Sequence, residues 1–198
     1  MNRVLILVNI TGLIIGISYG LHGPILPIFA KNVIGATYSE LGFIGLANFV
    51  PYMFIPLFVG ILLDRINNAY ILGLGAAINS ASIYLLSIAQ SVPEIMGFRI
   101  MTGIAHAFFW PPCESIISNE STEKSRVKHI SWFTMFFVMG FMIGPLIGTM
   151  FLENMDITYR ILFQIAAFIL AAGIITSLLT SRKNVKRHHE KFSFSAIK

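Results

Sequence analysis

The chain of 198 residues is strongly apolar: hydrophobic residues make up 56% of it, charged residues only 12%, and the mean hydropathy is +0.77. A soluble domain carries about twice that share of charge, so this composition excludes an ordinary soluble globular protein. The net charge of +5 comes from residues in the gaps between apolar stretches, which favours a membrane topology signal over nucleic-acid binding. The lone Cys113 excludes an intrachain disulfide and a cysteine metal cluster.

Six long apolar stretches follow one another along almost the whole chain. Each holds about 20 or more mostly apolar residues, the length of an α-helix that crosses the hydrocarbon core of a bilayer. A transmembrane β-barrel would need shorter strands of alternating polarity. We therefore predict an all-α membrane protein with a six-helix bundle over residues 1–180 and a basic tail over 181–198. The predicted transmembrane helices are residues 4–29, 39–62, 69–90, 93–118, 129–151 and 158–180.

The first stretch is interpreted as a membrane helix, because it is too long for the core of a cleaved signal peptide and has no small-x-small pattern at its end. Gly12, Gly16 and Gly20 form a stripe at four-residue spacing, which is typical of close helix packing. Gly23 and Pro24 interrupt the outer end of this helix. Interrupted helices often surround transporter sites, although a kink made only for packing explains the same residues.

The second stretch ends in a short polar loop that contains Gly60, Asp64 and Arg65. An Asp-Arg pair at a membrane edge can cap one helix and bind charges on a neighbour, while Gly60 permits close helix contact. A gating loop and an ordinary polar loop both fit this pattern. The residues after it are Asn67 and Asn68 rather than basic residues.

The fourth stretch places Arg99, Gly103, His106 and Trp110 within about 40° of one another on a helix, and Glu114 roughly continues the stripe beyond two prolines. An arginine in the membrane costs about 2.5–3.5 kcal/mol on insertion scales, so it favours a function. A series of cation, imidazole and carboxylate can line a substrate or proton path. Structural alternatives remain open: ion pairing for Arg99 and Glu114, a hydrogen bond for His106, and packing for Trp110.

The fifth stretch carries Gly140, Gly144, Pro145 and Gly148. The glycines line one face at four-residue spacing, and Pro145 bends the helix. We expect this stripe to be an exposed groove that receives a helix from a partner.

The Lys and Arg residues lie mainly in one set of loops, which predicts that both termini face the cytoplasm. Lys31 and Arg160 fall in the loops on the other side. The cytoplasmic set is Arg3, Arg65, Lys124, Arg126, Lys128, Arg182, Lys183, Lys186, Arg187, Lys191 and Lys198.

Three of these patterns together resemble the major facilitator superfamily, specifically its N-terminal six-helix half. The segment at residues 60–65 is similar to that family's Gly-x-Leu-x-Asp-Arg loop motif. Arg99 and Gly103 are similar to its Arg-x-x-x-Gly motif, and residues 140–148 are similar to the fifth-helix motif of its proton-driven antiporters. Asn67 and Asn68 depart from the loop motif, and Thr149 replaces the last glycine of the fifth-helix motif. The chain stops inside what resembles the loop between the two halves.

The resemblance implies a transporter of the cell membrane that moves a small solute by alternating access, with proton coupling and efflux of a drug or metabolite. The alternative is a truncated membrane subunit or assembly partner that does not transport. The expected partners are the lipid bilayer, a small-molecule substrate, protons and a second six-helix half, either a second copy or a separate chain. No motif predicts an enzyme, a metal site, a cofactor or a nucleic-acid partner.

Overall fold

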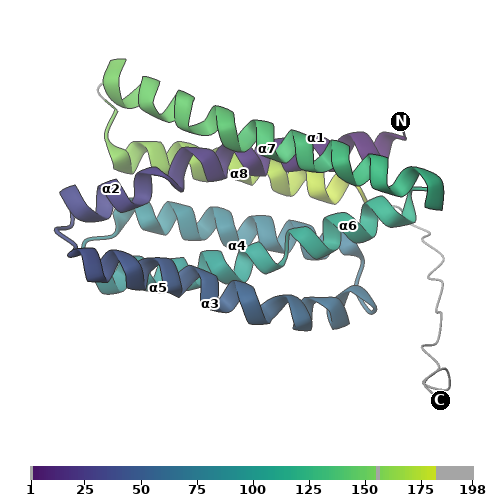
Figure 1. Ribbon diagram of the computed structural model, residues 1–198, viewed down its shortest axis with the longest axis horizontal. Coiled ribbons are helices and arrows are strands. Elements are labelled where there is room, and N and C mark those ends of the chain that lie inside the picture. The colour runs from purple at the N-terminus through teal and green to yellow at the C-terminus, as the bar shows by residue number, and fades with distance from the viewer. Residues whose placement is uncertain (1, 155–156, 182–198) are drawn as a thin grey trace.

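A computed structural model describes residues 2–154 and 157–181, and it shows a bundle of long helices that run alternately in opposite directions (Figure 1). Most of the predicted tail, from residue 182 onward, lies outside the described residues. The helices are α1 (Arg3–His22), α2 (Ile25–Asn32), α3 (Tyr38–Leu63), α4 (Asn68–Ile88), α5 (Val92–Ala107), α6 (Trp110–Asn119), α7 (Glu123–Asn154) and α8 (Tyr159–Leu179).

The eight helices make six passes along the bundle, because α1 continues into α2 and α5 continues into α6 (Figure 1). Within the described part of the chain, five segments are long and apolar enough to cross a membrane: α1 with α2, then α3, α4, α7 and α8. The remaining pass consists of α5 and α6, which are shorter helices of 16 and 10 residues. The predicted number and order of passes therefore agree with the structure.

The fourth pass differs from the single helix predicted at residues 93–118. At the break, the backbone N–H groups of Phe108 and Phe109 bond to the carbonyls three residues earlier, which tightens the chain into a turn. Pro111 and Pro112 then stand in the first turn of α6, where a helix does not need their missing N–H groups. The first pass breaks at Gly23 and Pro24, where its sequence predicted an interruption.

Helices α1 and α7 pack with their backbones in close approach through two glycine stripes. A Cβ atom on Gly144 would lie 2.5 Å from the Cα of Gly20, and one on Gly16 would overlap the carbonyl oxygen of Phe137. The expectation that Gly140, Gly144 and Gly148 form an exposed groove for a partner is therefore wrong. Helix α1 of the same chain fills the groove at the first two of these glycines, and Gly148 faces the side chains of Ile25 and Leu162.

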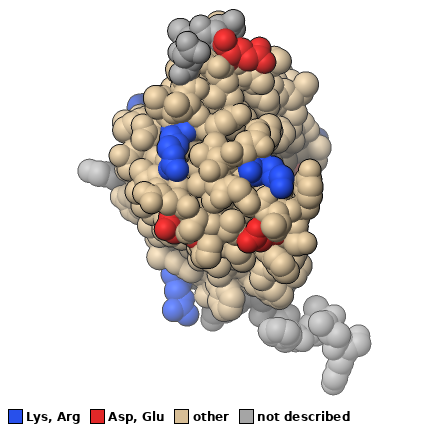
Figure 2. Space-filling view, turned by 90° about the vertical axis from the view of Figure 1, so that its left-hand side faces the viewer, with Lys and Arg blue, Asp and Glu red and all other residues tan. Residues whose placement is uncertain are grey.

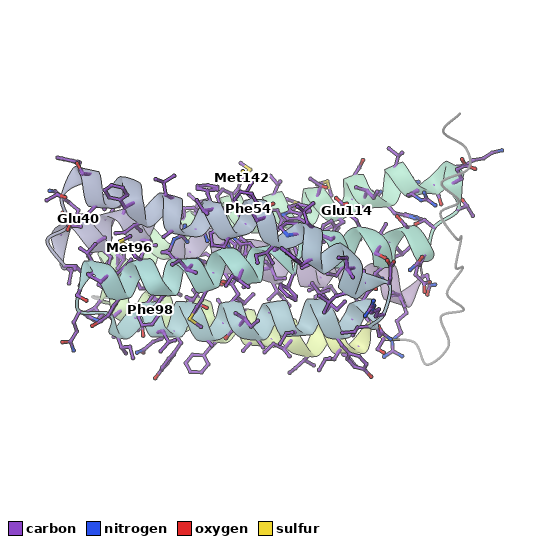
Figure 3. The ribbon with its side chains drawn as sticks, turned by 90° about the horizontal axis from the view of Figure 1, so that it is seen from below. Glu40, Phe54, Met96, Phe98, Glu114 and Met142 are labelled. Carbon is purple, nitrogen blue, oxygen red and sulfur yellow. The ribbon has the colours of Figure 1, made fainter. Side chains whose placement is uncertain are left out.

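Helices α3 and α7 lie on one long side of the bundle, and α4 and α8 lie on the opposite side (Figures 1 and 3). Most apolar side chains of α3 and α7 are exposed, whereas α4 and α1 bury many of theirs. The end of the bundle that carries α2 has only separate charged residues on a mostly uncharged surface (Figure 2).

Candidate functional site

A cluster of polar and aromatic side chains lies inside the bundle where α1, α3 and α5 meet. The ring centroids of Tyr19 and His106 are 4.4 Å apart, and the Tyr52 ring meets the His106 ring edge-on at 6.0 Å. Tyr19 also contacts His22, at 5.9 Å between ring centroids. Arg99 lies within electrostatic reach of Tyr19, His22 and His106. We call Tyr19, His22, Tyr52, Arg99 and His106 the Arg99 cluster.

Asn48 of α3 holds α5 at the position of Arg99. Its side-chain amide donates to Thr102 Oγ1 at 2.8 Å and to the Arg99 carbonyl at 3.3 Å. Thr102 Oγ1 in turn donates to the Arg99 carbonyl at 2.8 Å. Gly103 permits this contact, because a Cβ there would overlap the carbonyl oxygen of Asn48. The arginine backbone is therefore fixed by a buried hydrogen-bond network between two helices.

The polar side chains of the cluster are only partly satisfied. Arg99 Nη1 lies 3.5 Å from Thr102 Oγ1, a long hydrogen bond, and Arg99 Nε is buried with no hydrogen-bond partner among the described residues. His106 Nε2 and Asn79 Oδ1 are buried and unpaired in the same part of the chain. His22 is paired, because its Nδ1 lies 2.7 Å from the Ser18 carbonyl oxygen. Buried polar groups in native proteins are nearly always paired, so these atoms mark a candidate binding site.

Trp110 lies in an aromatic group beside the Arg99 cluster. Its ring contacts those of Phe109, Phe133 and Phe137 at centroid distances of 5.1–5.5 Å. Tyr19 joins the two groups through Phe109 and Phe137. The structure therefore places Trp110 among apolar rings rather than on the polar stripe.

Glu114 is exposed on α6, beyond the break in the fourth pass. In Figure 3, Glu40, Met96 and Phe98 lie toward one end of the bundle, Phe54 of α3 and Met142 of α7 lie near its middle, and Glu114 lies beyond them toward the other end. Fifteen residues separate Arg99 from Glu114, which is roughly 22 Å along a helix. The structure therefore gathers Arg99 and His106 of the predicted path but does not bring Glu114 to them.

Gly60 near the end of α3 is exposed, and so are Asp64 and Arg65 in the loop after it. A Cβ on Gly60 would meet no atom within 4 Å. The two following asparagines bind inward instead: Asn67 Nδ2 donates to Ser181 Oγ at 3.1 Å, and Asn68 Nδ2 donates to Ser115 Oγ at 2.7 Å. Neutral hydrogen bonds therefore tie this loop to α6 and to the end of α8.

Sequence reasoning missed Tyr19 of the first pass and Tyr52 of the second, whereas Asn48 was recognisable as a polar residue within the second apolar stretch. Periodicity identifies residues on one face of one helix, but it does not show which faces of different helices meet. The signal that was available is the polar character of Asn48 inside an apolar helix, since buried polar side chains in membranes usually have partners.

Two other features lie away from the cluster. A hollow of about 430 Å³ is lined by Phe29, Val33, Tyr159 and Arg160 among others, and it shares no residue with the Arg99 cluster. Arg160 is occupied there, because its Nη1 donates to the Ser87 carbonyl at 2.8 Å. Among the described residues, no group of three His, Cys, Asp or Glu side chains is placed to hold a metal ion.

Comparison with known proteins identifies relatives of the whole bundle. A family model described as the Major Facilitator Superfamily matches residues 8–197. The quinolone resistance protein NorA of Staphylococcus aureus (strain MRSA252) is 25% identical over 180 residues, covering 91% of this chain and 45% of NorA. Multidrug resistance protein 2 of Bacillus subtilis (strain 168) is 26% identical over 187 residues, covering 94% of this chain and 46% of that protein. The chain thus spans about half the length of the curated relatives it matches.

Solved structures with the same fold also match over about half of their length. The crystal structure of the nucleoside transporter NupG matches 98% of this chain and 48% of that chain, with a TM-score of 0.82 at 12% sequence identity. A bacterial homolog of the human lysosomal transporter Spinster, in an inward-facing and occupied conformation, matches 90% of this chain and 44% of that chain, with a TM-score of 0.71 at 20% identity.

Proposed function

Since the chain belongs to the major facilitator superfamily, we propose that it moves a small solute across a membrane by alternating access. The membership confirms the predicted family and the predicted six-helix fold, and it makes the chain a multi-pass integral membrane protein. The prediction that the chain is not an enzyme is confirmed as well, because the family consists of transporters and the relatives it matches are transporters.

The observation that carries the proposal is the Arg99 cluster. A guanidinium, two imidazoles and two phenols gather between apolar helices. Polar groups of this kind are costly inside a membrane protein, and they usually mark a substrate or ion path. The first helix of each broken pass ends beside the Arg99 cluster: His22 is the last residue of α1, and His106 lies in the last turn of α5. Interrupted helices at the centre of a bundle are a common feature of transporter sites.

For the substrate, the names of the relatives favour efflux of a drug or metabolite, because NorA is a quinolone resistance protein and a second relative is a multidrug resistance protein. For the coupling ion we propose protons, with His106 as the group that exchanges them inside the bundle. Histidine is suited to this role, since its charge changes between about pH 5 and 8 when its pKa is unperturbed. Glu114, exposed on α6, is the proposed proton acceptor at the cytoplasmic side.

The loop containing Gly60, Asp64 and Arg65 is the proposed gate at the cytoplasmic edge. Both charged residues are exposed, and neither forms an ion pair within the described part of the chain. They are therefore free to bind another unit when the transporter closes. We propose that both termini face the cytoplasm, which the concentration of Lys and Arg in one set of loops supports, and that the protein lies in the cell membrane.

The proposed partner is a second six-helix unit on the side of the bundle formed by α3 and α7. Both helices are rich in exposed Phe, Met and Leu side chains, and the chain matches only about half of its relatives' length. The Arg99 cluster would then lie in a cavity between two such units.

The test is accumulation of a fluorescent quinolone in cells that express the chain, with and without a protonophore. We expect lower accumulation than in cells without the chain, and loss of the difference on adding the protonophore. Arg99→Lys should raise accumulation while leaving thermal stability in detergent nearly unchanged, because a fork of donors is replaced by a point charge. A chain that folds and assembles but never changes accumulation would favour the non-transporting subunit.

A further inference from the structure

The charge of Arg99 has no counter-charge within the described residues. The nearest carboxylate in the sequence, Glu94, accepts from the backbone N–H of Gln90 at 2.7 Å. Glu40 is engaged with Thr37 in a capping box, and Glu114 lies on the far side of the break. The long contact with Thr102 Oγ1 is neutral. A cation that is largely buried and has no counter-charge is unfavourable, so an anionic ligand would stabilise this site.

The groups around Arg99 add hydrogen-bond donors and aromatic surface but no negative charge. His106 Nε2 is buried and unpaired, and its ring lies against Tyr19 on one side and Tyr52 on another. Arg99, His106, Tyr19 and Tyr52 each keep part of their surface exposed, although Arg99 Nε and His106 Nε2 are buried. The site therefore combines a fork of donors with flat apolar rings.

We propose that the Arg99 cluster binds the carboxylate of an aromatic organic anion, with Arg99 and His106 on the carboxylate and the rings of Tyr19 and Tyr52 against the aromatic part. This proposal rests on the proposed transport function and names its substrate class. The planar guanidinium matches a carboxylate with two parallel hydrogen bonds, and such bonds are about twice as strong as neutral ones. Aromatic rings add attraction in stacked or edge-on contacts.

The test compares three probes of the same size that differ in charge: naphthalene-2-carboxylate, naphthalene-2-carboxamide and 2-naphthylmethylammonium. Each is titrated calorimetrically into the purified chain in lipid nanodiscs, with empty nanodiscs to subtract partitioning into lipid. We expect the carboxylate to bind at least about tenfold more tightly than the carboxamide and the ammonium probe to bind most weakly. Arg99→Gln should remove this preference, and His106→Gln should reduce it.

The matched control is Arg160→Gln, because Arg160 has the same charge but lies at the other site and bonds to the Ser87 carbonyl. It should leave the carboxylate preference unchanged. If Arg99→Gln does not fold, Arg99→Lys replaces it and should weaken carboxylate binding about tenfold while keeping its preference over the ammonium probe. Thermal unfolding of each variant identifies folding failures.

Equal binding of the three probes, absence of binding, or a preference that survives Arg99→Gln would each overturn the proposal. A preference that is present in the purified chain but lost in cell membranes would also overturn it, because a carboxylate of another protein unit would then be the natural partner of Arg99. Failure of the transport function has a different signature, since carboxylate binding would persist without any flux. Flux without a preference for the carboxylate would instead retain the function and reject this substrate class.

Discussion

Asn48 shows how a single amide fixes the position of the charged residue next to it. It donates to both Thr102 Oγ1 and the Arg99 carbonyl, so it joins α3 to α5 at the level of the cluster. We expect Asn48→Ala to lower the free energy of unfolding by about 1–2 kcal/mol, because hydrogen bonds between membrane helices contribute about that much. Thermal unfolding in detergent measures the loss.

Asn32→Ala is the matched control, since Asn32 is an exposed amide at the end of α2 and its removal should change stability little. A double-mutant cycle of Asn48→Ala with Thr102→Val should show effects that do not add, because the two side chains share one hydrogen bond. Additive effects would mean that the observed bond contributes nothing measurable.

At the scale of single residues, the sequence predicted which groups are unusual but not which of them meet. Arg99 and His106 were identifiable because each is polar inside an apolar stretch and both lie on one helical face. Glu114 was placed on the same stripe, but the turn at Phe108 and Phe109 separates it from them. Tyr19 and Tyr52 carried no such signal, because tyrosine is common in membrane helices and their contact with His106 depends on the packing of three helices.

At the scale of helices, the six passes were predictable because the length and apolarity of a membrane helix are set by the bilayer. Their pairing was only partly predictable. The stripes at Gly16 and Gly144 both indicated close packing, but the sequence did not show that each was the other's partner. Two small-residue faces can meet each other or meet separate helices, and only the tertiary arrangement decides between these outcomes.

The contact between α1 and α7 leads to a prediction about stability. A methyl group added by Gly144→Ala would lie 2.5 Å from the Cα of Gly20, so the two backbones would have to move apart. We expect a loss of about 1–3 kcal/mol, as for other overpacked sites. The measurement is thermal unfolding in detergent.

Gly42→Ala on α3 is the control, because a Cβ there meets no atom within 4 Å. It should be neutral or stabilise the helix by up to about 1 kcal/mol, since alanine is the better helix former. Equal destabilisation by the two substitutions would show that helix propensity rather than the α1–α7 contact governs both sites.

At the scale of the whole molecule, the proposed orientation in the membrane rests on the charge of the loops. Val33 lies in the loop between α2 and α3 with 48% of its surface exposed, and Val127 lies near the start of α7 with 74% exposed. In a Cys113→Ala background, an impermeant thiol reagent added outside intact cells should label Val33→Cys but not Val127→Cys, because the positive loops stay inside. Permeabilised cells provide the control, in which both cysteines should react; the reverse pattern in intact cells would invert the topology.

We expect the side of the bundle formed by α3 and α7 to contact a second six-helix unit and the side formed by α4 and α8 to face lipid. Cross-linking can test this difference. Met53 of α3 and Met142 of α7 are 66% and 67% exposed, on the side proposed to face a second six-helix unit. In native membranes, Met53→Cys and Met142→Cys in the Cys113→Ala background should each form a cross-linked product with a bifunctional thiol reagent. Phe168→Cys on α8, which is 69% exposed, should not, because that side is expected to face lipid. The size of the product distinguishes a second copy from a separate chain. A strictly monomeric chain that transports alone would contradict the two-unit arrangement, because one bundle supplies only one wall of the cavity around Arg99.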